Sequence, residues 1–134
     1  MIIKKQLEHI FYGGFVIMDY NMYLPHMDVA DGVKRVMNNM TLYMKLLGKF
    51  KGREMADTIL NAIKLMNFDD IATATHALRG TAANLSFPNV YRITSEIEEI
   101  AKSKQDCSHL ANILDEAVNS LEDCISKLKI AKGV

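Results

Sequence analysis

The residue whose type and spacing point most directly to chemistry is His76, within the run of residues 71–85. An unprotonated imidazole nitrogen is a good nucleophile near neutral pH. Arg79 follows three residues later, one helical turn on, where its guanidinium can reach a negative group attached to the ring. The forked donors of arginine suit phosphoryl oxygens. These residue types predict a nucleophilic histidine beside a residue suited to an anion.

The direction of the His76 side chain follows from helical periodicity. At about 100° of rotation per residue, the apolar residues of the run fall on one narrow stripe, formed by Ile71, Ala74, Leu78, Ala82 and Leu85. His76 lies about 140° from Ile71 on the same scale, almost opposite that stripe. We therefore expect the imidazole to face solvent instead of the core.

The neighbours of His76 on this outer face are small. Beside Arg79 they are Ala72, Thr73, Gly80 and Ala83. A glycine inside a helix costs roughly 1 kcal/mol relative to alanine, so it calls for a reason. We interpret this face as cleared of bulk so that a partner can approach the ring. The alternative is that His76 is an ordinary surface histidine.

The elements that position this run are predicted to be helices. Helical spacing recurs through most of the chain, and strand-like alternation is scarce. We expect helices over residues 28–39 (capped by Asp28 or Asp31), 41–50 (capped by Thr41), 53–66, 70–85 (capped by Asn67 or Asp69), 88–104 and from 106 or 108 to 130. Short connections between the last four make neighbours antiparallel. The predicted fold is all-α: an up-down antiparallel four-helix bundle with extra N-terminal helical segments.

Residues 1–27 are predicted to form an N-terminal extension to a bundle of residues 28–134. The expectation is a short amphipathic helix over residues 4–11, a break at Gly13 and Gly14, and an arm that packs on the bundle. Met37, Met40 and Met44 lie on neighbouring turns, where they form either core or a soft patch that receives a partner.

Composition excludes several classes of function. Sixteen basic and sixteen acidic residues give a formal net charge of +0, so the sequence offers no basic surface for nucleic acid. The apolar run of residues 10–18 is far shorter than the roughly 20 residues of a membrane span. Cys107 and Cys124 have no paired spacing and are expected to be free thiols in a reducing cytoplasm. The four histidines show no metal-binding spacing, so no metal site is expected.

The run His76-Ala77-Leu78-Arg79-Gly80-Thr81-Ala82-Ala83-Asn84-Leu85 resembles the H-x-L-K-G-S/T-x-x-N-L signature of the histidine-phosphotransfer (HPt) family. The flanks resemble the family more weakly. They are Gly32-Val33-Lys34-Arg35-Val36, residues 42–50, Phe68-Asp69-Asp70 and Ile97-Glu98. Together these segments extend the resemblance over roughly residues 28–130.

This resemblance implies a phosphorelay intermediate. His76 would accept a phosphoryl group from an aspartyl phosphate on a response-regulator receiver domain and pass it to another receiver. Arg79 would steady the phosphoryl oxygens, Gly80 would allow close approach, and Ala72, Thr73 and Ala83 would contact the partner. Glu98 and Lys102 would orient the ring or receive the partner, or would simply be solvated charges.

The resemblance also implies what the chain does not supply. It would be a phosphocarrier without kinase activity or a cofactor of its own, with magnesium on the partner receiver. A hybrid histidine kinase is a further expected partner, and the chain is expected to be a cytoplasmic monomer. The sequence departs from the family pattern at Arg79, where lysine is usual, and at Ser86, where glycine is common. Residues 1–27 have no counterpart.

Two alternatives remain at this point. One is the dimerisation helix of a sensor histidine kinase, whose H-E-L-R-T-P-L motif is partly echoed, although Ala77 stands where the kinase has an acidic residue. No Gly-rich ATP-binding region follows in the sequence, which argues against it. The other is an adaptor bundle that binds a receiver without transfer, although such a decoy needs neither His76 nor Arg79.

Overall fold

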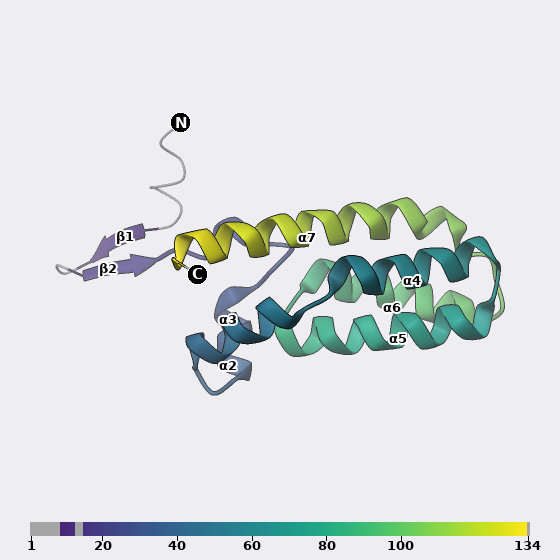
Figure 1. Cartoon of the computed structure of the whole chain (residues 1–134), viewed down its shortest axis with the longest axis horizontal. Coiled ribbons are helices and arrows are strands. Elements are labelled where there is room, and N and C mark those ends of the chain that lie inside the picture. Colours follow the sequence, from purple (N-terminus) through teal and green to yellow (C-terminus); the bar gives the residue numbers. More distant parts are fainter. Residues whose placement is uncertain (1–8, 13–14, 134) are drawn as a thin grey trace.

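The computed structural model describes residues 9–12 and 15–133, and its long elements are helices (Figure 1). In chain order the helical elements are η1 (Asn21–Tyr23), α2 (Val29–Arg35), α3 (Met40–Lys49), α4 (Gly52–Lys64), α5 (Phe68–Leu85), α6 (Pro88–Lys102), η2 (Ser108–Leu110) and α7 (Ala111–Ala131). They are preceded by two short strands, β1 (His9–Tyr12) and β2 (Phe15–Met18). From residue 19 onward, the described chain is helical or irregular, as predicted.

The four long helices form the body of the molecule. Figure 1 shows α4, α5, α6 and α7 side by side, with α2 and α3 at one end. Contacts run from α4 to α5, from α5 to α6, from α6 to α7 and from α7 back to α4, which closes the ring. Short links between consecutive helices make them antiparallel. The predicted up-down four-helix bundle is therefore confirmed.

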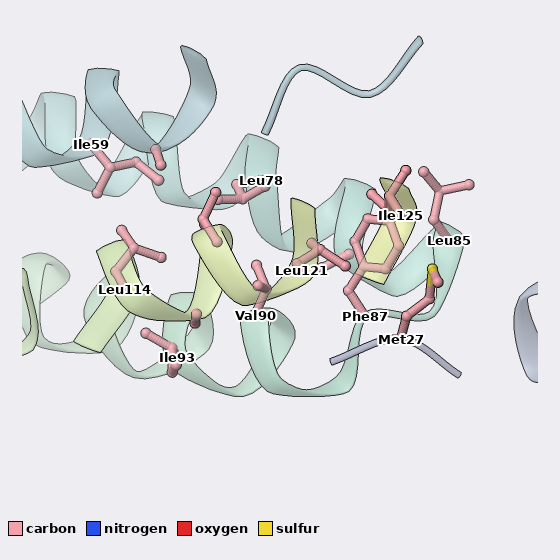
Figure 2. Close-up of a cluster of buried hydrophobic side chains, with 14 of the residues drawn as sticks. Met27, Ile59, Leu78, Leu85, Phe87, Val90, Ile93, Leu114, Leu121 and Ile125 are labelled. Carbon is pink, nitrogen blue, oxygen red and sulfur yellow. The ribbon is translucent and has the colours of Figure 1, made fainter. Parts of the chain in front are cut away.

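The core lies along the axis of this ring. Figure 2 shows Leu78 of α5, Ile93 of α6 and Leu114 and Leu121 of α7 in one cluster of buried side chains. Phe87 and Met27 extend the same cluster to the end of the bundle where α5 meets α6, and both are completely buried. Burying side chains of this size gives about 1.5–3 kcal/mol each, which holds α5 and its outward face in place.

Local backbone chemistry sets most helix ends, and two predicted boundaries are wrong. Asp28 caps α2 and Asn67 caps α5, as expected. However, α2 ends at Arg35 because Met37 and Asn38 adopt the left-handed conformation, with φ of 60° and 59°. The following helix therefore begins at Met40, and its cap is Asn39, not Thr41. Asparagine satisfies an early N–H of the helix in the same way that threonine would.

The predicted N-terminal helix over residues 4–11 is wrong over residues 9–11, the part of it that the structure describes. Residues 9–11 are not helical but form part of strand β1, which pairs antiparallel with β2. The break expected at Gly13 and Gly14 falls on residues outside the described part of the chain. Residues 4–8 lie outside the described part of the chain.

The predicted packing arm is present from residue 19 to residue 27. Tyr23 and Met27 are buried, so the arm contributes to the same core as the helices. Backbone hydrogen bonds join the arm to the bundle. The Asn89 N–H donates to the Pro25 carbonyl at 3.1 Å, and the Asp28 N–H donates to the Ser86 carbonyl at 2.9 Å. Of the three methionines on neighbouring turns, Met44 is in the core and Met37 is 91% exposed, so they do not form one patch.

Both cysteines are buried free thiols, as predicted, and burial raises the pKa of each. Among the described residues, no helix has the length and apolar character to cross a membrane.

Candidate functional site

The site is built on α5, the helix that carries His76. Asn67 caps the helix, because its side-chain oxygen accepts a hydrogen bond from the Asp70 N–H. Asp69 and Asp70 place negative charge in the first turn, where it interacts favourably with the helix dipole and stabilises the helix. Its buried stripe is Ile71, Thr75, Leu78, Ala82 and Leu85, with Ala74 only half-buried. Thr75 was not predicted to be core; its hydroxyl is satisfied by donating to the Ile71 carbonyl at 2.7 Å.

The His76 side chain faces outward, as the periodicity predicts. It is 66% exposed, and its Nδ1 lies 3.0 Å from Oε2 of Glu98 on the neighbouring helix α6. Nε2 lies across the ring from this contact. One nitrogen of this largely exposed ring is therefore engaged by the protein.

Glu98 is the centre of a cluster of charged groups. Its side chain is only 5% exposed, although it is a carboxylate on a surface helix. Arg79 Nε lies 2.9 Å from its Oε1, and Lys102 Nζ lies 3.1 Å from its Oε2. Burial alone would raise the pKa of Glu98, but the hydrogen bonds from Lys102 and His76 and the charge of Arg79 outweigh it. The net pKa lies below the ordinary value, so the carboxylate is ionised at neutral pH.

This ionised carboxylate determines the tautomer of the imidazole. Arg79 Nη2 also lies 3.3 Å from His76 Nδ1, but arginine can only donate, and Nδ1 cannot both donate to Glu98 and accept from Arg79. The contact to Glu98 is shorter and charge-assisted, so Nδ1 carries the proton and donates it to Oε2. The lone pair then resides on Nε2, the nitrogen that Glu98 leaves free.

The small residues predicted around His76 do leave the outer face open. Thr73 and Gly80 are exposed, and Ala72 and Ala83 are half-buried. A Cβ placed on Gly80 meets nothing within 4 Å, so no contact inside the folded chain requires a glycine at this position. This part of the outer face therefore carries no side-chain bulk.

The predicted site residues on the two helices come together in register. α5 and α6 are antiparallel neighbours, and Glu98 lies beside His76. Lys102 lies one turn further along α6, 64% exposed, with its ammonium group turned back to Glu98. The structure thus excludes the interpretation of Glu98 as a solvated charge. Lys102 remains a surface residue that is tied to the site through Glu98.

Sequence reasoning did not foresee how Arg79 is held. The sequence predicts only that Arg79 can reach a negative group on His76. In the structure its Nε already forms an ion pair with Glu98, and its side chain is 32% exposed. A further contact that was missed is at the end of α5, where Ser86 adopts the left-handed conformation with φ 60° and donates to Asp31 Oδ2 at 2.8 Å. The glycine common in the family at Ser86 was the available signal for that backbone conformation.

Two comparisons with known proteins find a match to the chain. Residues 50–129 match the family model of the Hpt domain. The fold also matches the crystal structure of the HPT domain from the Hpt sensor hybrid histidine kinase from Shewanella, with a TM-score of 0.71 and 15% sequence identity, over 78% of this chain and 94% of that one. No curated protein matches the chain.

The chain therefore belongs to the Hpt domain family. Its role is that of a histidine phosphotransfer module in a phosphorelay. The match covers a narrower region than the predicted resemblance over residues 28–130, because it begins at the end of α3.

Proposed function

We propose that His76 accepts a phosphoryl group on Nε2 from an aspartyl phosphate of a response-regulator receiver domain, and passes it to a second receiver. The observation that carries this proposal is the contact between His76 Nδ1 and the buried Glu98 carboxylate, at 3.0 Å, on a ring that is 66% exposed. This arrangement fixes the ring and leaves its nucleophilic nitrogen available to a partner.

The transfer step is a displacement at phosphorus. The Nε2 lone pair forms a bond to phosphorus, and the bond between phosphorus and the aspartyl oxygen breaks, which returns that aspartate to a free carboxylate. Nδ1 keeps its proton throughout, so the ring becomes cationic as the new bond forms. The ionised Glu98 stabilises this positive charge through the hydrogen bond that it already accepts. Transfer to the second receiver is the reverse of this step.

Arg79 supplies charge next to the transferred group. It lies within one helical turn of His76, and its guanidinium is already oriented by Glu98. Phosphoryl transfer depends mainly on positioning and on charge stabilisation of the phosphoryl oxygens. Arg79 provides both, with Lys102 as a second cation that is tied to the same carboxylate.

The magnesium expected for this chemistry belongs on the receiver in this proposal. It would neutralise the phosphoryl oxygens at the donor aspartate. The residues around His76 do not fit the ion, because Glu98 is already paired with Arg79 and Lys102 and the site is otherwise cationic. We also propose a phosphocarrier and not a kinase, because Ala77 stands where a histidine kinase has an acidic residue. Its partners in this proposal are receiver domains and a hybrid histidine kinase.

The test is labelling by a set of phosphorylated receiver domains, with His76→Gln as the variant and His109→Gln as the control. Both histidines are exposed, so both substitutions leave the core intact. We expect acid-labile label on wild type and on His109→Gln, none on His76→Gln, and none on wild type from ATP alone. Circular dichroism should show equal helical content.

Two outcomes would contradict the proposal. Label on the His76→Gln variant would move the acceptor elsewhere. Stable binding of a phosphorylated receiver by wild type, with no label transferred, would make the chain an adaptor instead.

A further inference from the structure

A hollow of about 350 Å³ opens at the C-terminal end of α5, outside the site described above. Its lining is largely apolar and comes from three helices and a turn: Arg35, Ala82, Ala83, Ser86, Phe87, Pro88 and Tyr91. Phe87 is completely buried and provides the floor, while Tyr91 at the rim is 41% exposed. A preformed hollow of this kind fits one apolar side chain of a partner.

The hollow faces the same way as His76. Ala83 comes seven residues after His76 on α5, which is two turns, about 10.5 Å along the axis and about 20° in rotation. On the antiparallel helix α6, Tyr91 comes seven residues before Glu98. The two helices therefore present the pair His76 and Glu98 at one level and the pair Ala83 and Tyr91 two turns away, on one continuous face.

A receiver domain bound at His76 would also cover this hollow, because a protein interface is wide enough to reach it. A specific complex buries about 800 Å² on each side, which corresponds to a disc of about 16 Å radius. A receiver that places its aspartyl phosphate on Nε2 must centre its contact near His76. A disc of that size covers a hollow about 10 Å away on the same face.

The rim of the hollow carries a cation that is held in place. Arg35 Nε donates to Asp31 Oδ2 at 2.7 Å, and the same carboxylate oxygen accepts from Ser86 at 2.8 Å. The hydrogen bonds from Arg35 and Ser86 lower the pKa of Asp31. Asp31 engages the guanidinium through Nε, which leaves the Nη groups for an acidic group of the partner.

We propose that this hollow is a second anchor point of the transfer interface, which takes an apolar side chain of the receiver domain and pairs Arg35 with an acidic residue beside it. The inference rests on the proposed function, because it takes the receiver as the occupant. It adds Arg35, Phe87 and Tyr91 to the partner contacts expected near His76, and it gives Ala83 a specific role as part of the hollow that sets how tightly a receiver docks.

The test fills the hollow and measures transfer from the phosphorylated receiver that labels wild type fastest. Ala83→Leu is the variant. Thr58→Leu is the control, because Thr58 of α4 lines another hollow, of about 390 Å³, with Thr81 of α5. Thr81 lies about 140° around the helix from His76, so this hollow opens on a different side of α5. For Ala83→Leu we expect KM to rise roughly 10-fold or more with kcat within about 2-fold of wild type. Thr58→Leu should keep both constants.

A second variant, which removes a charge at the rim instead of filling the hollow, distinguishes weaker docking from a defect in folding. Arg35→Gln should raise KM and reduce the dependence of kcat/KM on salt, since it removes one interfacial charge. Thermal unfolding of all variants should be unchanged within a few degrees.

The failure of this inference differs from that of the proposed function. An unchanged KM in both Ala83→Leu and Arg35→Gln, with label still lost in His76→Gln, would overturn the anchor alone. Label that persists in His76→Gln, or a wild type that no receiver labels, would overturn both.

Discussion

The arrangement of the site depends on one residue, whose carboxylate is buried. Glu98 is almost fully covered, yet three groups that donate hydrogen bonds converge on it from His76, Arg79 and Lys102. A buried charge is costly unless it is paired, and here the pairing fixes the His76 ring and its tautomer. The orientation of the His76 ring is therefore set by a residue on the adjacent helix.

Glu98→Gln should make the stability of the protein less sensitive to acid. The pKa of Glu98 is lowered by folding, so its contribution to stability is complete above the ordinary value of 4.5 and is lost as the pH falls through the folded value. The free energy of unfolding, measured by urea titration between pH 3 and pH 7, should therefore differ most between wild type and variant near neutral pH. A gap that stays constant down to pH 3 would contradict this.

Arg79 substitutions should separate charge from geometry. Arg79→Ala removes the guanidinium and leaves Glu98 with two partners, so we expect slower transfer, by roughly 10- to 100-fold in kcat, in rapid-quench measurements. Arg79→Lys keeps the charge and should recover most of the rate, since lysine is usual at this position in the family that the sequence resembles. Equal rates for Arg79→Ala and wild type would exclude Arg79 from the transition state.

The two opposite faces of helix α5 meet different requirements. Its inner stripe anchors the helix in the bundle, and its outer face has little side-chain bulk around His76. Helix stability alone would favour larger or more helix-prone residues on the outer face. The exposed Gly80 is where these demands conflict most clearly.

Gly80 substitutions should therefore improve the helix and impair transfer. A Cβ at Gly80 has open space, so Gly80→Ala should raise the free energy of unfolding by about 0.5–1 kcal/mol. Gly80→Gln should be tolerated by the fold but should block the approach of a receiver to His76, seen as a large loss of kcat/KM.

Gly48 provides the control for this test. It is also helical and exposed, and a Cβ added to it would meet nothing within 4 Å, but it lies on α3 and not beside His76. Gly48→Gln should keep transfer at the wild-type rate. A similar loss in both glycine variants would indicate a general effect of bulk on folding or solubility instead of a blocked partner.

For the whole molecule, the short helices α2 and α3 hold the end of α5. The Tyr43 hydroxyl of α3 donates to the Leu85 carbonyl at 2.8 Å, and the ring of Tyr43 is completely buried against Gly32 of α2. Together with the bond from Ser86 to Asp31, this ties the N-terminal half of the chain to the helix that carries His76.

Gly32→Ala should therefore destabilise the protein. The new Cβ would overlap the ring of Tyr43, which cannot move aside because it is enclosed by core and anchored through its hydroxyl. Overpacking of this kind costs about 1–3 kcal/mol, which thermal unfolding would show as a fall in Tm of several degrees. An unchanged Tm would mean that α2 can shift without loss.

Much of the fold could be predicted because local patterns carry it. Helical spacing, the caps Asp28 and Asn67, and Pro88 at the start of α6 each act within a few residues, so they are visible in the sequence. The errors lie where local signals compete. The left-handed pair Met37 and Asn38 shortened α2, and strand pairing takes up residues 9–11, the end of the helix expected over residues 4–11.

The outward direction of the His76 imidazole could be predicted from helical spacing alone, because it follows from the positions of Ile71, Leu78 and Ala82 on a single helix. Which nitrogen of that ring is engaged, and where the surface near it is hollowed, depend instead on how the helices pack. Glu98 lies on another helix, and the hollow near Ala83 is assembled from α2, α5 and α6. The burial of a carboxylate and the shape of a hollow depend on how helices pack, and no pattern within one helix records that.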